Sequence, residues 1–176
     1  LAAFVAKMES TKGGDPFDAA TGFGPMATEQ VRAEAHALVD DAKSKGVTVR
    51  TGGELPTGAG WFYPATVLTE VTPEMKIYRE ECFGPVACVY RVSSIAEAIT
   101  RANDSDFGLA ASVWTNDQDE IDELQNGLEF GAVFANGNTA SFFGLPFGGV
   151  KNSGYGRELG QFGIREFVNA KTVWQV

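Results

Sequence analysis

The chain has 176 residues, which fits about one domain and is long enough to bury a single core. Its hydrophobic fraction of 44% and charged fraction of 21% are typical of a soluble globular protein. The formal net charge of -9 argues against nucleic acid and anionic membranes as partners, because both would repel the chain. No apolar run approaches the roughly 18 residues that span a bilayer, and no signal-peptide pattern is present, so we expect a cytoplasmic protein.

The first residues have the pattern of an amphipathic helix. Leu1, Phe4, Val5 and Met8 follow the spacing of one helical face, yet no Ser, Thr, Asp or Asn precedes Leu1 to cap the first turn. We therefore expect a helix that begins before Leu1, and hence a chain that is the C-terminal portion of a longer protein. The alternative is a naturally short protein whose first helix frays.

The next part of the chain alternates between helix and strand patterns. A polar, Gly-rich loop at 10–25 is followed by a helix at 28–45, and Gly46 stands where a left-handed residue ends a helix. The apolar face of this helix comprises Val31, Ala35, Leu38, Val39 and Ala42. Strand patterns lie at 47–50 and 62–68, separated by a loop rich in Gly and Pro.

The second half continues this alternation. The predicted elements are a buried strand at 86–92, a helix at 95–102 capped by Ser93 or Ser94, a strand at 110–115, a helix at 117–126 and a strand at 131–135. We therefore predict an α/β fold, a largely parallel open sheet with flanking helices. A Gly-rich segment at 136–160 interrupts the pattern, and a loop of that length is functional or disordered; its aromatic residues favour order. A short helix at 158–168 and a last strand at 171–176 follow.

The two cysteines and the single histidine suggest neither a disulfide nor a metal site. Cys82 and Cys88 are six residues apart across a predicted strand, which is neither a disulfide framework nor a metal-binding spacing. Glu80 and Glu81 would raise the pKa of the Cys82 thiol, so we interpret Cys82 as a packing residue and not as a nucleophile. His36 lies in a helix pattern without an obvious partner, and we expect a solvated or locally bonded imidazole.

Three motifs carry a family resemblance. They read Glu-Glu-Cys-Phe-Gly-Pro-Val at 80–86, Pro-Phe-Gly-Gly-Val-Lys-Asn-Ser-Gly at 146–154 and Gly-Arg-Glu-Leu-Gly at 156–160. Together they resemble the aldehyde dehydrogenase superfamily, along the whole chain and most closely the succinate-semialdehyde dehydrogenases. In that family the cysteine nucleophile lies upstream of the position of Leu1. The resemblance implies a partial catalytic domain at 1–168, without the nucleophile segment and the dinucleotide-binding domain, and an oligomerisation strand at 169–176.

The resemblance implies roles for four residues. Glu81 would accept hydrogen bonds from both hydroxyls of the nicotinamide ribose, which suits a carboxylate because it has two acceptor oxygens. Phe83 would present its ring to the nicotinamide, on the same side of an extended segment as Glu81. Phe147 would line the substrate tunnel, and Ser141 would lie near the distal carboxylate of a semialdehyde.

Several of these residues also have a purely structural interpretation. Glu80 and Glu81 would then be an acidic surface pair beside a core aromatic, and Ser141 a loop residue that bonds its own backbone. Arg157 and Glu158 are interpreted as a structural ion pair and not as substrate ligands. The glycines around them suggest a backbone that folds tightly against the catalytic core.

The function implied for the parent protein is that of an NAD(P)+-dependent aldehyde dehydrogenase. It would oxidise an aldehyde, with succinate semialdehyde favoured, to the carboxylate through a cysteine thiohemiacetal and thioester. The cofactor would be NAD or NADP, with no metal, and the chain alone is predicted to be inactive. We expect a homo-oligomer formed through the C-terminal strand. The alternatives are a non-catalytic assembly module derived from the family and an unrelated α/β binding protein.

Overall fold

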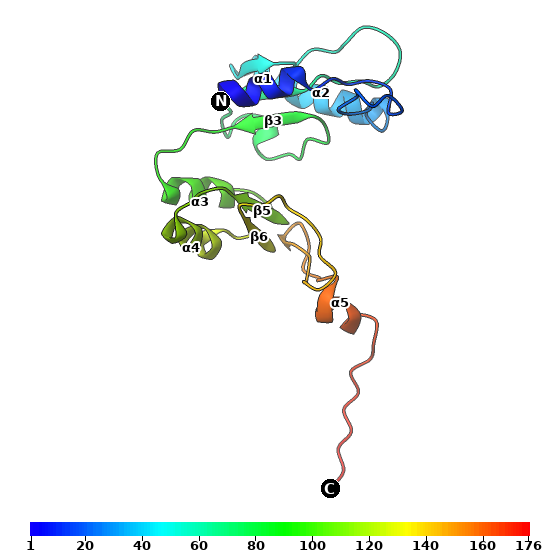
Figure 1. Ribbon diagram of the computed structural model, residues 1–176, viewed down its shortest axis with the longest axis vertical. Coiled ribbons are helices and arrows are strands. Elements are labelled where there is room, and N and C mark those ends of the chain that lie inside the picture. Colours follow the sequence, from blue (N-terminus) through cyan, green and yellow to red (C-terminus); the bar gives the residue numbers. More distant parts are fainter. The chain divides into compact units, whose positions relative to one another are not determined.

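The structure is a computed structural model that describes residues 1–176 (Figure 1). The chain forms two compact units, Leu1–Arg91 and Val92–Val176. None of its helices combines the length and the apolar character that a membrane span requires.

The first unit contains three helices and a three-stranded sheet. Its elements are α1 (Ala2–Ser10), α2 (Glu29–Ser44), β1 (Thr48–Thr51), β2 (Thr66–Thr69), the short 3-10 helix η1 (Lys76–Tyr78) and β3 (Val86–Val89). The strand order is β1-β2-β3, with β1 antiparallel and β3 parallel to β2. Thr66 is opposite Val86 in the parallel pair, so the loop that precedes β3 ends beside the start of β2.

Helix α2 has the end signals that the sequence predicts. The Thr28 side chain accepts a hydrogen bond from the Val31 amide at 3.1 Å, which satisfies one free donor of the first turn. Gly46, just beyond the helix, has a φ of 89°, a conformation that glycine adopts without steric cost. The buried residues of α2 are Ala35, Leu38, Val39 and Ala42. The predicted apolar face is therefore confirmed for these four, while Val31 is half-buried.

The core of the first unit lies between α2 and β2. Strand β2 is buried along its whole length. The core cluster comprises Leu38, Val39, Ala42, Tyr63, Leu68, Val71, Met75 and Ile77. Burying one such aliphatic side chain contributes about 1.5–3 kcal/mol, so this cluster is the main apolar contribution to the stability of the unit. Strand β3 is only half-buried and ends at Val89, so it is shorter and more exposed than the strand predicted at 86–92.

The second unit contains three helices and two short sheets. Its elements are α3 (Ile95–Asn103), β4 (Phe107–Gly108), β5 (Ala110–Val113), α4 (Gln118–Gly127), β6 (Ala132–Ala135), β7 (Val150–Lys151) and α5 (Gly160–Arg165). Helices α3 and α4 lie side by side. At the start of α3, Ser94 Oγ accepts from the Glu97 amide at 3.1 Å, and the Glu97 carboxylate accepts from the Ser93 amide at 2.8 Å. Ser94 is thus the cap, and Ser93 takes part in the reciprocal bond.

The α/β class is confirmed, but the strands form three short sheets instead of one. Strands β5 and β6 are parallel and are connected by α4, while β2 and β3 are parallel and have η1 between them. Strands β1 and β2 are joined without a helix and are antiparallel. Strands β4 and β7 are also antiparallel, although β5, α4 and β6 lie between them in the chain. Parallel neighbours need a crossover connection whereas antiparallel neighbours can be joined by a simple loop, which explains the difference between the β5–β6 and β1–β2 pairs.

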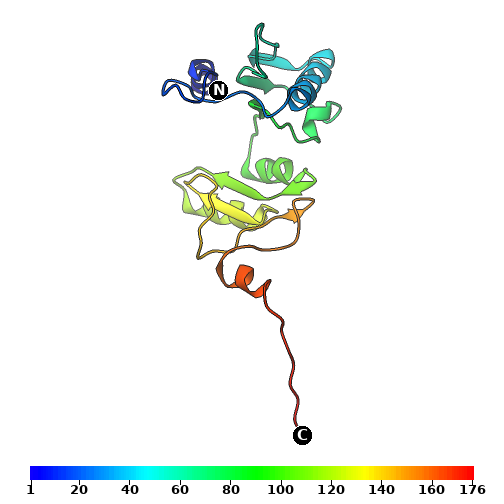
Figure 2. The same cartoon turned by 90° about the vertical axis from the view of Figure 1, so that its right-hand side faces the viewer.

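The C-terminal residues have no regular structure beyond α5, which is shorter than the helix predicted at 158–168. No strand is present at 171–176, where the sequence predicts one, and every residue from 164 to 176 is exposed. Figure 2 shows this tail running away from the helices and strands of its unit. A strand needs a neighbour for its backbone hydrogen bonds, so the predicted strand is absent from the single chain.

Candidate functional site

The loop at residues 80–85 joins η1 to β3 and carries the first pair of predicted site residues. The Glu80 amide donates a hydrogen bond to the Lys76 carbonyl at 2.9 Å. The Pro85 carbonyl accepts one from the Thr66 amide at 2.8 Å. The loop is therefore attached at both ends, to η1 on one side and to the start of β2 on the other.

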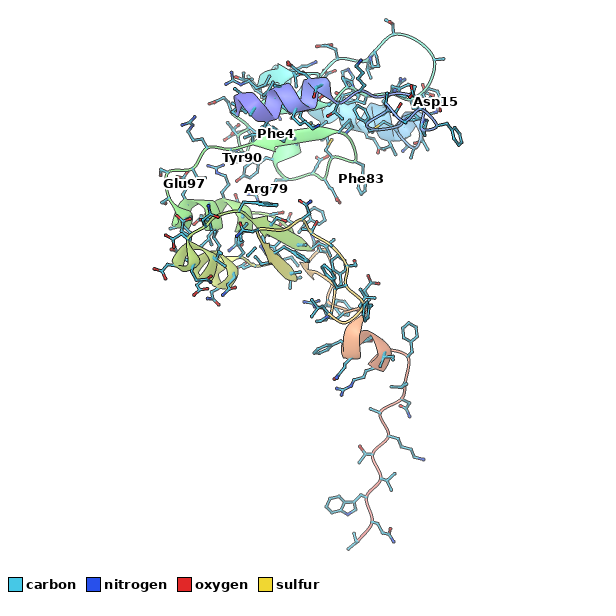
Figure 3. All side chains as sticks on the ribbon, viewed as in Figure 1. Phe4, Asp15, Arg79, Phe83, Tyr90 and Glu97 are labelled. Atoms are coloured by element: carbon cyan, nitrogen blue, oxygen red, sulfur yellow. The ribbon has the colours of Figure 1, made fainter.

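Exposure alternates along this loop. Glu81 is exposed, Cys82 is half-buried and Phe83 is 71% exposed (Figure 3). Glu81 and Phe83 are thus both on the exposed side of the loop. The backbone between them is not an extended strand, because the Gly84 amide donates to the Cys82 carbonyl at 2.9 Å and makes Phe83 the centre of a tight turn. Phe83 is thus not a core aromatic. The Glu81 carboxylate has no hydrogen-bond or ion-pair partner in the chain, which leaves both of its oxygens free to accept.

Neither cysteine has the properties of a reactive thiol. Cys82 and Cys88 are free, half-buried and packed against the core cluster of the first unit. Burial raises the pKa of the Cys82 thiol, and burial with a smaller contribution from Cys82 raises the pKa of Cys88 to about 11. The packing role predicted for Cys82 is confirmed. The cause of its raised pKa is desolvation, however, and not the neighbouring carboxylates.

His36 is bonded locally, one of the two states that the sequence predicts. Its Nε2 lies 3.2 Å from the Asp40 carboxylate, one turn along α2, and its Nδ1 lies 3.2 Å from the Tyr63 hydroxyl. Tyr63 is 2% exposed, and burial raises the pKa of its phenol. His36 therefore gives a buried hydroxyl its partner and links α2 to the chain that enters β2.

The second pair of predicted site residues lies in the Gly-rich segment of the second unit. Phe147 is half-buried and exchanges two backbone hydrogen bonds of 2.8 Å with Glu158, so that residues 147–158 form a closed loop. Ser141 is exposed, and its hydroxyl makes no hydrogen bond within the chain. The structural alternative for Ser141, a serine bonded to its own backbone, is therefore not what the structure contains.

Glycines allow this closed loop to approach other backbone closely. A Cβ atom at Gly131, just before β6, would lie 1.7 Å from the Gly148 carbonyl oxygen. A Cβ atom at Gly148 would lie 2.2 Å from the carbonyl oxygen of Gly156. A side chain at either position would collide with backbone, so the loop packs directly on the start of β6. A Cβ atom at Gly154 or Gly156 would meet nothing within 4 Å, so the glycines directly before Arg157 are not the ones in close contact.

The predicted ion pair between Arg157 and Glu158 is not formed. Instead, Arg157 Nη1 donates hydrogen bonds to the carbonyl oxygens of Gly149, at 2.6 Å, and Gly156, at 2.8 Å. Adjacent side chains in an extended segment point to opposite sides, which keeps the two charges apart. The role of Arg157 was missed because backbone carbonyls as partners leave no signal in the sequence.

Phe147 borders a hollow of about 470 Å³ in the second unit. Leu109 and Phe167 add apolar surface to its lining, while Arg157, Glu158 and Glu166 add charge. Ser141 does not line this hollow. Phe147 therefore lies at a concave and partly apolar surface, and Ser141 lies outside it.

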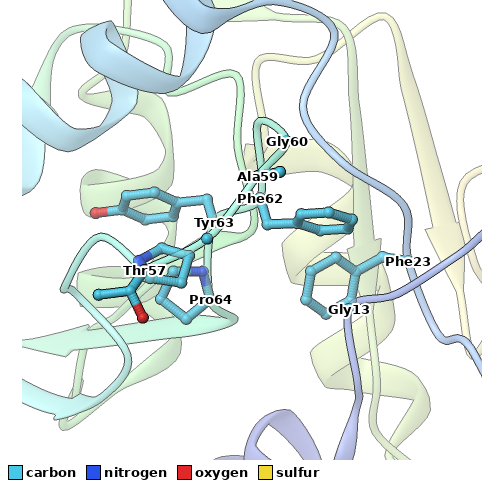
Figure 4. Close-up of a pocket in the computed structure, with 10 residues that line it drawn as sticks. Gly13, Phe23, Thr57, Ala59, Gly60, Phe62, Tyr63 and Pro64 are labelled. Atoms are coloured by element: carbon cyan, nitrogen blue, oxygen red, sulfur yellow. The ribbon is translucent and has the colours of Figure 1, made fainter.

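A further hollow, in the first unit, was not predicted from the sequence. It has a volume of about 290 Å³ and is lined by residues of the loops that contain Phe23 and Phe62 (Figure 4). The Phe23 and Phe62 rings lie on one side of it and the Tyr63 ring on the other. Both loops are irregular and distant in sequence, so no periodic pattern could identify this hollow.

The exposed pair of Glu81 and Phe83 fits a nicotinamide ribose in its chemistry. The carboxylate offers two free acceptor oxygens to a vicinal diol, and the neighbouring ring is exposed enough to contact a flat heterocycle. By contrast, no group of three or more His, Cys, Asp or Glu side chains is placed to hold a metal ion.

Known proteins are similar to this chain in sequence. The model of the aldehyde dehydrogenase family matches residues 1–173. An aldehyde dehydrogenase of Paenarthrobacter nicotinovorans is 63% identical over 171 residues. The NADP(+) succinate-semialdehyde dehydrogenase 1 of Mycobacterium ulcerans is 53% identical over 171 residues. Each of these two alignments covers 97% of this chain and 37% of the relative.

Solved structures give the same result. The succinic semialdehyde dehydrogenase of Streptococcus pyogenes, in complex with NADP+, superimposes with a TM-score of 0.93 at 35% identity, over 99% of this chain and 38% of the other. The betaine aldehyde dehydrogenase of Staphylococcus aureus, in complex with NAD+, gives a TM-score of 0.89 at 37% identity, over 94% and 34%. The chain spans little more than a third of the length of these relatives. Because the family model matches almost every residue, the chain belongs to the aldehyde dehydrogenase family.

Proposed function

We propose that this chain contributes to the active site of an NAD(P)+-dependent aldehyde dehydrogenase that oxidises succinate semialdehyde to the carboxylate. The observation that carries the proposal is the exposed, unpaired carboxylate of Glu81 beside the exposed ring of Phe83. A buried or paired carboxylate would have no free oxygens for a cofactor. The substrate and cofactor are supported by the names of relatives in Mycobacterium ulcerans and Streptococcus pyogenes.

In this proposal the first unit holds the nicotinamide end of the cofactor. Glu81 accepts hydrogen bonds from the two ribose hydroxyls, and hydrogen bonds to a charged group are worth about 1.5–3 kcal/mol each. The exposed Phe83 ring contacts the nicotinamide and limits where it can lie. When bound, a nicotinamide cofactor supplies the hydride acceptor for aldehyde oxidation.

The second unit is proposed to contact the aldehyde. Phe147 provides apolar wall at its concave surface, which excludes water from the carbon chain of the substrate. The unpaired Ser141 hydroxyl donates to the distal carboxylate of the semialdehyde. A donor at that position suits a charged group better than an apolar wall would.

The chain by itself is proposed to lack dehydrogenase activity and to bind NAD(P)+ weakly. Its two thiols are half-buried with raised pKa values, so neither is a thiolate near neutral pH. We propose that the nucleophilic cysteine and the general base belong to another part of the enzyme. Tight cofactor binding by the 176-residue chain in isothermal titration would contradict this proposal.

The complete coding sequence tests the proposal. It should encode a Gly-Gln-x-Cys-type segment before Leu1, and the enzyme expressed from it should reduce NADP+ or NAD+ with succinate semialdehyde. Glu81→Gln should raise the KM of the cofactor about tenfold. Glu80→Gln, which removes the same charge from the adjacent exposed residue, is the control and should change it less than about twofold. Equal effects of the two variants would overturn the assignment of Glu81.

A second candidate function is that of a non-catalytic assembly module. The C-terminal tail is fully exposed, with Val173 at 80% and Trp174 at 84% exposure, and it would add a strand to a sheet of another subunit in a homo-oligomer. Light scattering on the 176-residue chain should then show self-association that is lost when residues 169–176 are removed. A monomer in both cases would contradict this function.

A further inference from the structure

The loop at 80–85 is attached to the rest of the first unit at its ends but not in its middle. Glu80 and Pro85 make the backbone hydrogen bonds that anchor it. Between them, the backbone makes only local bonds, from the Gly84 amide to the Cys82 carbonyl at 2.9 Å and from the Val86 amide to the Gly84 carbonyl at 2.8 Å. These bonds form tight turns within the loop, but they do not connect its central three residues to the rest of the unit.

Only one of those three side chains enters the protein. Glu81 is exposed and Phe83 is 71% exposed, whereas Cys82 packs against the core cluster that α2 and β2 supply. A buried neutral thiol behaves as a small apolar side chain, so its burial is favourable and directional for the loop. With Cys82 held inward, both of its neighbours lie on the exposed side of the loop.

We propose that Cys82 is a positioning residue, which holds Glu81 and Phe83 in the orientation that receives the nicotinamide ribose. This inference rests on the proposed function of Glu81. Cys82 does not touch the cofactor; it acts by filling a core position directly beneath the two residues that do. Its place in the motif is then explained by its volume and apolar character and not by thiol chemistry.

Cys88 provides a matched control, because it is the other half-buried thiol packed against the same core cluster. It lies in β3, opposite Leu68 of β2, and is held there by the strand pairing. Truncating either cysteine removes one sulfur from the same core. A purely structural role would therefore give the two Ala variants similar consequences, whereas a positioning role makes only Cys82 matter for the cofactor.

The test uses the full-length dehydrogenase and the variants Cys82→Ala, Cys82→Val, Cys88→Ala and Glu81→Gln. Both Ala variants should lower the melting temperature by similar amounts. Cys82→Ala should raise the KM of NAD(P)+ about threefold to fivefold, with the KM of the aldehyde changed less than about twofold. Cys88→Ala should leave the KM of the cofactor within about twofold of the original value. Cys82→Val, which restores an apolar side chain, should return that KM close to the original value.

The outcomes separate this inference from the proposed function. If Glu81→Gln raises the KM of the cofactor and the two Ala variants behave alike, the role of Cys82 is overturned while that of Glu81 stands. If Glu81→Gln does not change the KM of the cofactor, both the proposed role of Glu81 and this inference fail. If Cys82→Ala does not fold, Cys82→Val and Cys82→Ser replace it in the test. Cys82→Ser, which places a polar hydroxyl in the core, should raise the KM of the cofactor, and Cys82→Val should not. Equal KM values for these two variants would overturn the inference.

Discussion

The two segments that carry the predicted site residues are held in place in different ways. The loop at 80–85 depends on a hydrophobic core, into which Cys82 inserts, and on the contact of Pro85 with the buried strand β2. The loop at 147–158 has little core beneath it. It depends on two backbone hydrogen bonds between Phe147 and Glu158, on glycines that allow close contact, and on the guanidinium of Arg157.

This difference teaches what each segment tolerates. A segment oriented by packing depends on the volume and polarity of one buried side chain and accepts another of similar shape. A segment oriented by close backbone contact depends on the absence of side chains and on particular donors, and accepts almost no change at those positions. The two segments should thus respond to different substitutions.

The largest effect is expected for Gly131→Ala in the second unit. Its methyl group would collide with the Gly148 carbonyl oxygen, and because that oxygen belongs to the backbone, only a shift of the main chain could relieve the strain. We expect a loss of about 3 kcal/mol in the free energy of unfolding, measured by thermal or urea denaturation. Gly144→Ala, at a position with nothing within 4 Å, is the control and should be close to neutral. Equal stability of the two variants would show that close contact does not constrain this loop.

A smaller effect, in the first unit, is expected for Thr66→Val. The Thr66 hydroxyl accepts from the Gly53 amide at 2.9 Å and donates to the Pro64 carbonyl at 2.8 Å, while the Thr66 amide holds Pro85. Valine would leave a buried donor unpaired, at a cost of about 1–3 kcal/mol. Urea denaturation should detect this loss, and Thr66→Ser, which keeps the hydroxyl, should recover most of it. In Thr66→Val, amide hydrogen exchange should become faster around Val86 but not around Phe147, which would show that the two segments are held independently.

Arg157→Met tests the hydrogen bonds that hold the second segment, the loop at 147–158. It keeps much of the side-chain volume but removes the donor to two carbonyl oxygens, so we expect a loss of about 1–2 kcal/mol. Hydrogen exchange at the Phe147 and Glu158 amides should quicken as the loop opens. Arg165→Met removes the same charge from an exposed residue of α5 and should leave those amides unchanged. Similar exchange rates in both variants would show that Arg157 does not hold this loop in place.

A last effect concerns alkaline pH and the thiols, which both lie in the first unit. Burial raises the pKa of Cys88 from 9.0 to about 11. Between these values the unfolded chain has lost the proton that the folded chain retains, so the contribution to stability is complete below about pH 9 and is lost as pH rises through 11. Across this pH range, the melting temperature should fall less steeply with pH for Cys88→Val than for the original chain. If the melting temperature changes equally with pH in both proteins, the Cys88 thiol titrates in the folded state as it does in the unfolded state.

Much of the local structure was predictable, because its causes are local. The Thr28 cap, the left-handed Gly46 and the apolar face of α2 follow from short-range spacing and backbone preference. The exposure of Glu81 and Phe83 agrees with the alternation expected along the motif, although the backbone at Phe83 is a tight turn. The division into three sheets and the hollow beside Phe23 were not predictable, because they depend on which distant segments meet.

The amino-acid sequence by itself determined the α/β class, the family and the identity of the residues that face outward in the motif at 80–86. These features follow from residue type and spacing, which act over a few neighbours along the chain. Only the tertiary structure decided that Arg157 binds carbonyl oxygens instead of Glu158, that desolvation and not charge raises the pKa of Cys82, and that the C-terminal tail has no strand partner in the single chain. Burial and long-range contacts arise when remote segments pack together, and no local pattern encodes them.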